Sequence, residues 1–239
     1  MRAVPIVLFL GLAGCASAPP GEIADPFEPM NRQVHGFNKS LDAAVLRPVS
    51  QALAGGGQPA NGPGAMEMVG NFGSNLALPG KVVNSLLQGR PEPAARNMFR
   101  FLVNSTVGIG GLFDLATEDF NLPEVDTGFA ETLHVWGVPA GAYLELPVLG
   151  PSTQRDLVGT VVDVLLLDSL GNRVHRDVAR AGLAARLLSK AGDRAQFGST
   201  VDSVLHESAD SYAQTRLLYI QRRQYELKEE GEVIDPYSE

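Results

Sequence analysis

Glycine and proline interrupt this chain so often that long, uninterrupted elements are not expected. The 26 glycines and 16 prolines make up about 18% of the 239 residues, against about 12% in average usage. Both residues weaken helix and strand interiors, which excludes an extended coiled coil. Yet 44% of the residues are hydrophobic, which is too many for a disordered chain. The length suits one domain or at most two, and the sequence predicts short helices separated by turns.

The first 24 residues predict an export signal followed by a lipid anchor. Val4–Leu12 is an apolar run that is too short to span a bilayer and is typical of a secretory signal. It ends in Leu12-Ala13-Gly14-Cys15, which resembles the lipobox of bacterial lipoproteins, where cleavage precedes a lipidated cysteine. We therefore predict a signal peptide over residues 1–14 and a lipidated tether over 15–24, beginning at Cys15. The alternative is a chance cysteine after an ordinary signal peptide.

Charge and motifs exclude several classes of function. The formal net charge of −8 argues against nucleic acid as a partner. The single cysteine can form neither an internal disulfide nor a cysteine-based zinc site, and the four histidines form no local ligand pair. Gly108-Ile109-Gly110 lacks the third glycine of the dinucleotide fingerprint. We predict a protein that is not an enzyme, with no catalytic residue, no metal and no cofactor.

Helical spacing of apolar residues dominates residues 25–230, which we interpret as a single helical domain followed by a flexible tail over 231–239. Pro48 is expected to end or kink the first helix, Gly89 to follow a helix end, and Pro91 to begin a helix. The expected helical segments are Met30–Val45, Met66–Leu76, Lys81–Gln88, Ala94–Val103, Leu157–Leu165, Arg173–Lys190 and Val201–Tyr219.

Three further segments carry local signals. Residues 55–64 are rich in glycine and predict a loop, and Tyr143–Leu146 predicts a short strand. Ser152 is a candidate cap for the helix that follows it. Thr106–Phe113 is apolar, rich in glycine and uncharged, which is typical of a place where packed backbones approach closely. The alternative for that last segment is a buried, tight connection.

Six blocks of residues occur in the order typical of the VacJ/MlaA family of outer-membrane lipoproteins, which the chain resembles over residues 25–223. The blocks are Asp25–Arg32; Phe37-Asn38 with Arg47-Pro48; Asn71-Phe72, Asn75-Leu76, Pro79 and Leu86–Gly89; Arg100-Phe101 with Asn104–Thr106 and Gly108–Leu112; Thr132-Leu133, Trp136–Val138, Tyr143, Leu146-Pro147, Gly150–Thr153 and Arg155-Asp156; and Ser208, Asp210, Tyr212, Arg216, Tyr219 and Gln221–Arg223. The chain departs from the family in its glycine-rich stretch between Val49 and Ala65, and in Ser211, where proline is frequent.

The resemblance implies a mainly α fold with little β-structure, a ring or horseshoe of short amphipathic helices lying in the membrane plane. Such helices satisfy their own backbone hydrogen bonds and need no apolar span of about 20 residues. The implied function is removal of mislocalised phospholipids from the outer leaflet of the outer membrane of a Gram-negative bacterium, through a polar pore. The implied partners are phospholipid, a trimeric porin and a periplasmic lipid-carrier protein. The anchored protein would face the periplasm.

The same resemblance supplies candidate site residues. Cys15 would carry the lipid, and the candidates for lining or gating the pore are Asn31, Arg32, Phe37, Asn38, Gly108, Gly110, Gly111, Arg155 and Asp156. The alternatives are that Phe37 belongs to the core, that Asn31 caps a helix and that Arg155 and Asp156 form intramolecular salt bridges.

Two other functions stay open on the sequence. One is a structural lipoprotein that docks onto a porin without conducting lipid. The other is a lipid hydrolase that uses Ser152, although Gly150-Pro151-Ser152-Thr153-Gln154 lacks the second glycine of the G-x-S-x-G motif.

Overall fold

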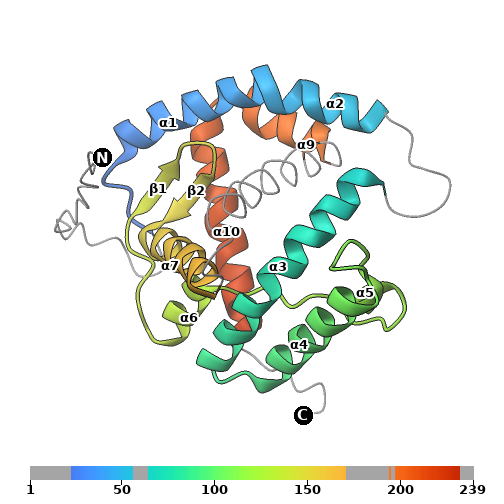
Figure 1. The fold of residues 1–239 in the computed structure, drawn as a ribbon. Helices are drawn as coiled ribbons and strands as arrows, with labels where there is room; N and C mark the ends of the chain where they lie inside the picture. The colour runs from blue at the N-terminus through green and yellow to red at the C-terminus, as the bar shows by residue number, and fades with distance from the viewer. Residues whose placement is uncertain (1–22, 56–63, 171–193, 195–196, 232–239) are drawn as a thin grey trace, which may run out of the picture.

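The computed structural model describes residues 23–55, 64–170, 194 and 197–231 (Figure 1). Several sequence predictions lie outside these residues. They are the signal peptide, Cys15, most of the tether, nearly all of the glycine-rich loop, the helix expected over Arg173–Lys190 and the tail after Gly231.

The first three helical elements follow one another without a break and form a single arm along one edge of the molecule (Figure 1). They are α1 (Glu28–Leu41), the π-helical segment η1 (Asp42–Leu46) and α2 (Arg47–Gly55). We expected Pro48 to end or kink the helix, and the first of these does not occur. A proline ring would meet a carbonyl of the preceding helical turn, and here that turn is the wider π-helical one.

A helical hairpin, α3 (Ala65–Leu87) and α4 (Pro91–Thr106), lies on the other side of the molecule (Figure 1). Pro91 is the first residue of α4, and Gly89 follows the C-cap residue of α3, both as predicted. The two helices expected over Met66–Leu76 and Lys81–Gln88 are instead one helix that continues through Pro79. Packing against α4 compensates for the helical hydrogen bond that Pro79 removes.

The middle of the chain holds two short helices, α5 (Leu115–Glu118) and α6 (Phe129–Val135), and then an antiparallel hairpin of β1 (Tyr143–Leu146) and β2 (Gly150–Thr153). The strand β1 was predicted and β2 was not. Helix α7 (Gln154–Leu170) begins directly after β2, and its cap is Thr153, whose Oγ1 accepts a hydrogen bond from the Asp156 N–H at 3.2 Å. The prediction of Ser152 as the cap was wrong by one residue, because Ser152 lies inside β2.

The last elements are α9 (Gly198–Asp202), the π-helical segment η2 (Ser203–Glu207) and the long helix α10 (Ser211–Gly231), which runs across the molecule past the β hairpin (Figure 1). The described chain is thus mainly α with one two-stranded sheet, as the sequence predicts. No helix in this described part combines the length and apolar character needed to cross a bilayer.

The interior of the described chain is unusually polar. Seven apolar residues are buried, counting neither glycine nor proline, whereas eighteen polar or charged residues are. Large apolar side chains are instead abundant on the surface, where 27 are exposed. A soluble domain buries its apolar residues preferentially. The distribution in this chain is the inverse of that pattern.

Candidate functional site

The inverted burial, with polar residues inside and apolar residues outside, is clearest along α4. Asn97, Arg100 and Asn104 lie on its buried face at helical spacing. Met98 and Leu102 lie on the opposite face and expose 45% and 54% of their surface. Helix α4 therefore presents a polar face inward and an apolar face outward, which suits an apolar surrounding better than water.

Helix α3 repeats this arrangement in part. Asn75, Asn84 and Ser85 are buried, and Leu76 and Leu86 are exposed, although Leu78 and Val82 are also buried. The buried amides are used: Asn84 Nδ2 donates to Asp163 Oδ1 at 2.9 Å, and Asn84 Oδ1 accepts from the Thr132 hydroxyl at 3.0 Å. The polar interior is therefore a connected network rather than a set of isolated groups.

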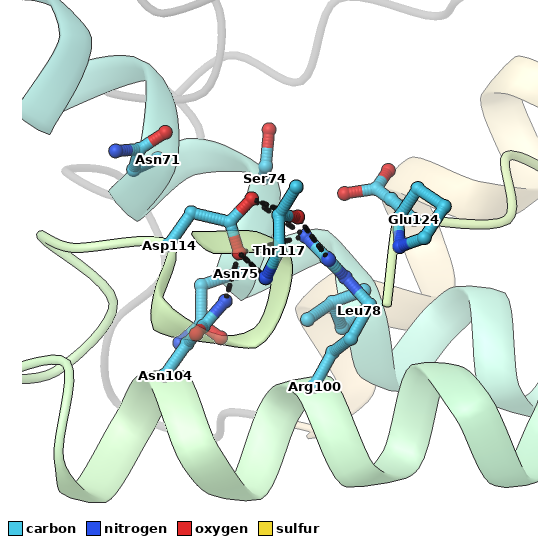
Figure 2. Close-up of a pocket in the computed structure, with 10 residues that line it drawn as sticks. Asn71, Ser74, Asn75, Leu78, Arg100, Asn104, Asp114, Thr117 and Glu124 are labelled. Atoms are coloured by element: carbon cyan, nitrogen blue, oxygen red, sulfur yellow. Dashed lines mark hydrogen bonds and ion pairs between the residues drawn. The ribbon is translucent and has the colours of Figure 1, made fainter. Parts of the chain in front are cut away.

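A polar cavity of about 150 Å³ lies where α3 and α4 meet the segment around α5 (Figure 2). The residues lining it are Asn71, Ser74, Asn75, Leu78, Arg100, Asn104, Asp114, Thr117, Pro123 and Glu124. Figure 2 shows the side chains of Arg100 and Asn104 rising from α4 toward Asp114 and Thr117. Most of these groups are polar, so the cavity suits a polar group or water and not a hydrocarbon chain.

An ion pair forms one wall of this cavity. Both Asp114 carboxylate oxygens accept from Arg100 Nη2 at 3.0 Å, and Asn104 Nδ2 donates to Asp114 Oδ1 at 2.9 Å. Burial favours the neutral form of Asp114, but hydrogen bonds from Thr117, Asn104 and Arg100 outweigh it and lower the pKa of this carboxyl. Asp114 thus pairs with a buried arginine, although its own side chain stays partly exposed.

Two polar atoms at the cavity have no partner within the described structure. Asn75 Oδ1 and Arg100 Nε are buried and make no hydrogen bond there. Buried polar groups are rarely left in this state without water or a ligand. The cavity therefore offers both an acceptor and a donor to a polar occupant.

The glycine-rich turn after α4 closes the cavity from another side. A Cβ on Gly111 would lie 2.5 Å from the Asn75 Cβ, and one on Gly108 would lie 2.5 Å from the Phe113 carbonyl oxygen. At these two positions the expected close approach is confirmed. Gly110 has open space around it, and glycine suits it through its φ of 71°.

We expect Gly111→Ala to destabilise the protein more than Gly110→Ala. Both residues have positive φ, 94° and 71°, so both substitutions carry the backbone strain of about 1–2 kcal/mol. Only at Gly111 does the new methyl group also meet Asn75, which adds about 1–3 kcal/mol of overpacking. Thermal unfolding of both variants in detergent measures the difference, and equal destabilisation would contradict the close packing of Gly111 on α3.

The four candidates on α1 divide into two pairs. Asn31 and Asn38 hold α1 to the β hairpin: Asn31 Oδ1 accepts from the Glu145 N–H at 2.9 Å, and Asn38 Oδ1 accepts from the Val148 N–H at 2.7 Å. Asn31 is fully buried within α1, so it is not the helix cap that the alternative proposed. These two amides position the helix on the hairpin.

Arg32 and Phe37 lie at the surface instead. The Arg32 guanidinium donates to both Asp210 oxygens, at 3.0 and 2.9 Å, and lies 4.6 Å from the centre of the Tyr212 ring. Phe37 exposes 53% of its surface, so the alternative that it belongs to the core is wrong. The structure therefore does not bring the four residues into one site.

Arg155 and Asp156 are adjacent in sequence but belong to different contacts. Asp156 pairs with Arg223, whose Nη2 lies 3.0 Å from its Oδ1, and accepts a hydrogen bond from the Tyr219 hydroxyl. Arg155 Nε is 3.7 Å from Asp156 Oδ1. Burial favours the neutral form of Asp156, yet the Arg223 hydrogen bonds and charge prevail and lower its pKa. The intramolecular alternative is confirmed for Asp156, whose closer partner is Arg223, whereas Arg155 comes only within 3.7 Å of this carboxylate.

Ser152, the candidate nucleophile, is buried, and its hydroxyl donates to the Thr153 carbonyl oxygen at 3.3 Å. No group of three or more histidine, cysteine, aspartate or glutamate side chains that could hold a metal occurs among the described residues. Sequence reasoning missed the polar cavity, although the spacing of Asn97, Arg100 and Asn104 opposite Met98 and Leu102 carried its signal.

Known proteins match nearly the whole described chain. A family model described as MlaA lipoprotein matches residues 23–226. The chain is 36% identical over 195 residues to an uncharacterized protein of Rickettsia felis, covering 82% of this chain and 74% of that one. It is 33% identical over 223 residues to the intermembrane phospholipid transport system lipoprotein MlaA of Escherichia coli, covering 90% and 83%.

A solved structure agrees with the fold. That structure was solved in work on the structural basis for maintenance of bacterial outer membrane lipid asymmetry. The two chains superpose with a TM-score of 0.70 at 31% sequence identity, covering 85% of this chain and 99% of that one.

Proposed function

The chain belongs to the MlaA lipoprotein family, and from this premise we propose that it removes mislocalised phospholipids from the outer leaflet of a bacterial outer membrane. In this proposal it is a transport component and not an enzyme. Phospholipid passes through a polar opening in a ring of helices that lie in the membrane plane, and a periplasmic carrier protein receives it. Cys15 carries the lipid anchor, and a trimeric porin is the neighbour in the membrane.

The observation that carries this proposal is the inverted burial of α3 and α4. An apolar outer face such as that of Met98, Phe99 and Leu102 is stable against acyl chains, while a polar interior accommodates a head group. One helix pair therefore supplies the two surfaces that an amphipathic cargo needs. A protein that only docks onto a porin has no need of the interior polar network.

The candidate residues take roles within this proposal. Asn31 and Asn38 set the position of α1, and Arg32 and Phe37 control access from the exposed side of that helix. Gly108, Gly110 and Gly111 shape the turn beside the polar cavity, while Arg155 and Asp156 lie at a second polar cluster near α10.

Deleting the gene tests the proposal. We expect phospholipid in the outer leaflet of intact cells to rise, as measured by a surface-reactive label, and the wild-type gene to reverse the rise. A variant carrying Phe99→Lys and Leu102→Lys is expected not to reverse it, because each lysine facing lipid costs about 2.5–3.5 kcal/mol.

Glu92→Lys provides the matched control, since it places a lysine on the same helix at a side chain that is 73% exposed and already polar. This variant is expected to restore lipid asymmetry. An unchanged outer leaflet in the deletion strain would overturn the proposal, and a porin-bound protein with no effect on lipid would indicate the docking lipoprotein instead.

A further inference from the structure

A second cavity, of about 250 Å³, lies apart from α3 and α4, between the start of α7 and the second half of α10. We call it the Arg155 cavity. Its lining residues are Ile23, His134, Ala140, Thr153, Arg155, Ile220, Arg223, Gln224 and Leu227. Four of these are apolar, and the polar ones include two arginines. A lining that combines apolar side chains with a few placed polar groups is typical of a ligand site.

Arg155 is a buried cation with an incomplete set of partners. Its side chain is 4% exposed, and Nε makes no hydrogen bond within the described structure. The carboxylate of Asp156 lies 3.7 Å from it but is already bonded to Arg223 and Tyr219. A buried charge needs close pairing to offset its lost hydration, so an anionic group in this cavity would complete the pairing.

His134 adds a neutral donor beside this cation. A guanidinium only donates, so His134 Nδ1, 3.1 Å from Arg155 Nη1, is an acceptor and the ring proton lies on Nε2. Burial lowers the pKa of His134, and the charges of Arg155 and Arg223 lower it further, which keeps the ring neutral at pH 7. Within the described part of the chain, the Nε2–H of His134 has no hydrogen-bond acceptor.

Of the two arginines that line the cavity, only one is fully paired with carboxylates of the described residues. Arg223 is matched by Glu131 at 2.5 Å and by Asp156 at 3.0 Å. Arg155 is the cation with no carboxylate within hydrogen-bond distance in the described structure. A ligand that brings one negative charge therefore suits Arg155 better than a neutral one.

We propose that the Arg155 cavity binds the phosphate of a phospholipid, with Arg155 and the His134 Nε2–H as donors and the start of one acyl chain against Ile220 and Leu227. A phosphate diester carries one negative charge and several acceptor oxygens, which is what these donors lack. The apolar side chains of the lining favour a phosphate that is attached to hydrocarbon over free inorganic phosphate. This inference rests on phospholipid being the cargo.

Photo-crosslinking of the full-length protein in detergent tests the site. The probes are a phospholipid and a diacylglycerol that carry the same diazirine on the same acyl chain. We expect the phospholipid to label residues 220–227 at least ten times more efficiently than the diacylglycerol, as mapped by mass spectrometry. Arg155→Gln should remove most of this preference, while Arg222→Gln, at a side chain of α10 that is 81% exposed, should leave it unchanged.

A second pair of variants keeps the test valid if Arg155→Gln impairs folding. Leu227→Trp fills the cavity and should abolish labelling of the segment, whereas Leu217→Trp, at an exposed position of α10, should not. Equal labelling by both probes, or labelling that survives Leu227→Trp, would overturn the site. If either of these results is found and the wild-type protein still restores lipid asymmetry in cells, the proposed site is wrong but the transport function stands.

Discussion

We expect Asp114→Ala to lower the free energy of unfolding by about 3–5 kcal/mol, the range found when one partner of a buried ion pair is removed. The substitution leaves the Arg100 guanidinium, whose side chain is 4% exposed, without its carboxylate. It also removes the side-chain cap of α5, because Asp114 accepts a hydrogen bond from the Thr117 N–H. Chemical unfolding of the detergent-solubilised protein measures the loss.

A matched control separates this effect from general loss of charge. Glu92→Ala breaks the exposed pair of Glu92 with Arg96, also on α4, and should change the unfolding free energy by less than about 1 kcal/mol. If Asp114→Ala were as mild as Glu92→Ala, the Arg100–Asp114 pair would not be the structural link between α4 and α5 that the contacts indicate.

The second large effect is expected at Asn31, the fully buried amide of α1. Asn31→Leu retains the approximate side-chain volume but removes hydrogen bonds to Asp25 Oδ1, the Tyr143 carbonyl and the Glu145 N–H. Each buried group left without a partner costs about 1–3 kcal/mol, so a total loss of about 3 kcal/mol or more is expected. The unfolding midpoint in denaturant measures it.

Two variants sharpen this expectation. Asn31→Asp keeps the acceptor for the Glu145 N–H but loses both donors and places a second carboxylate beside Asp25, so it should also be strongly destabilising. Arg32→Ala removes a neighbouring but exposed side chain and should have little effect. Similar stability of Asn31→Leu and wild type would show that α1 is held to β1 by other contacts.

The sequence predicts helix ends and strands correctly where the conformational preference of a single residue determines them. Pro91 begins α4 because its fixed φ suits a first helical position, and Gly89 follows α3 because a helix end favours glycine there. Tyr143–Leu146 is a strand between Gly141 and Pro147. Each of these depends on a conformational preference that acts over a few residues.

Other features depend on packing between distant segments, which local spacing does not reveal. Pro79 does not end α3, because contacts with α4 outweigh the lost hydrogen bond. The pair of Asp114 with Arg100 joins residues 14 positions apart on different elements. The Arg155 cavity unites residues from 23 to 227, and such a juxtaposition cannot be read from local spacing. Family resemblance supplied the proposed function but not these contacts.

The inverted interior has a thermodynamic consequence. Unfolding raises the heat capacity by newly hydrating apolar surface and lowers it by hydrating polar surface. In this chain, Phe99 and Leu102 are exposed before unfolding, whereas Asn97 and Asn104 become hydrated only afterwards. For the protein in water, with no lipid or detergent on these faces, the heat-capacity change of unfolding is therefore smaller than the typical value of about 12–15 cal/mol/K per residue. A small heat-capacity change means a shallow stability curve, so cooling weakens this fold less than it weakens a soluble domain of equal length.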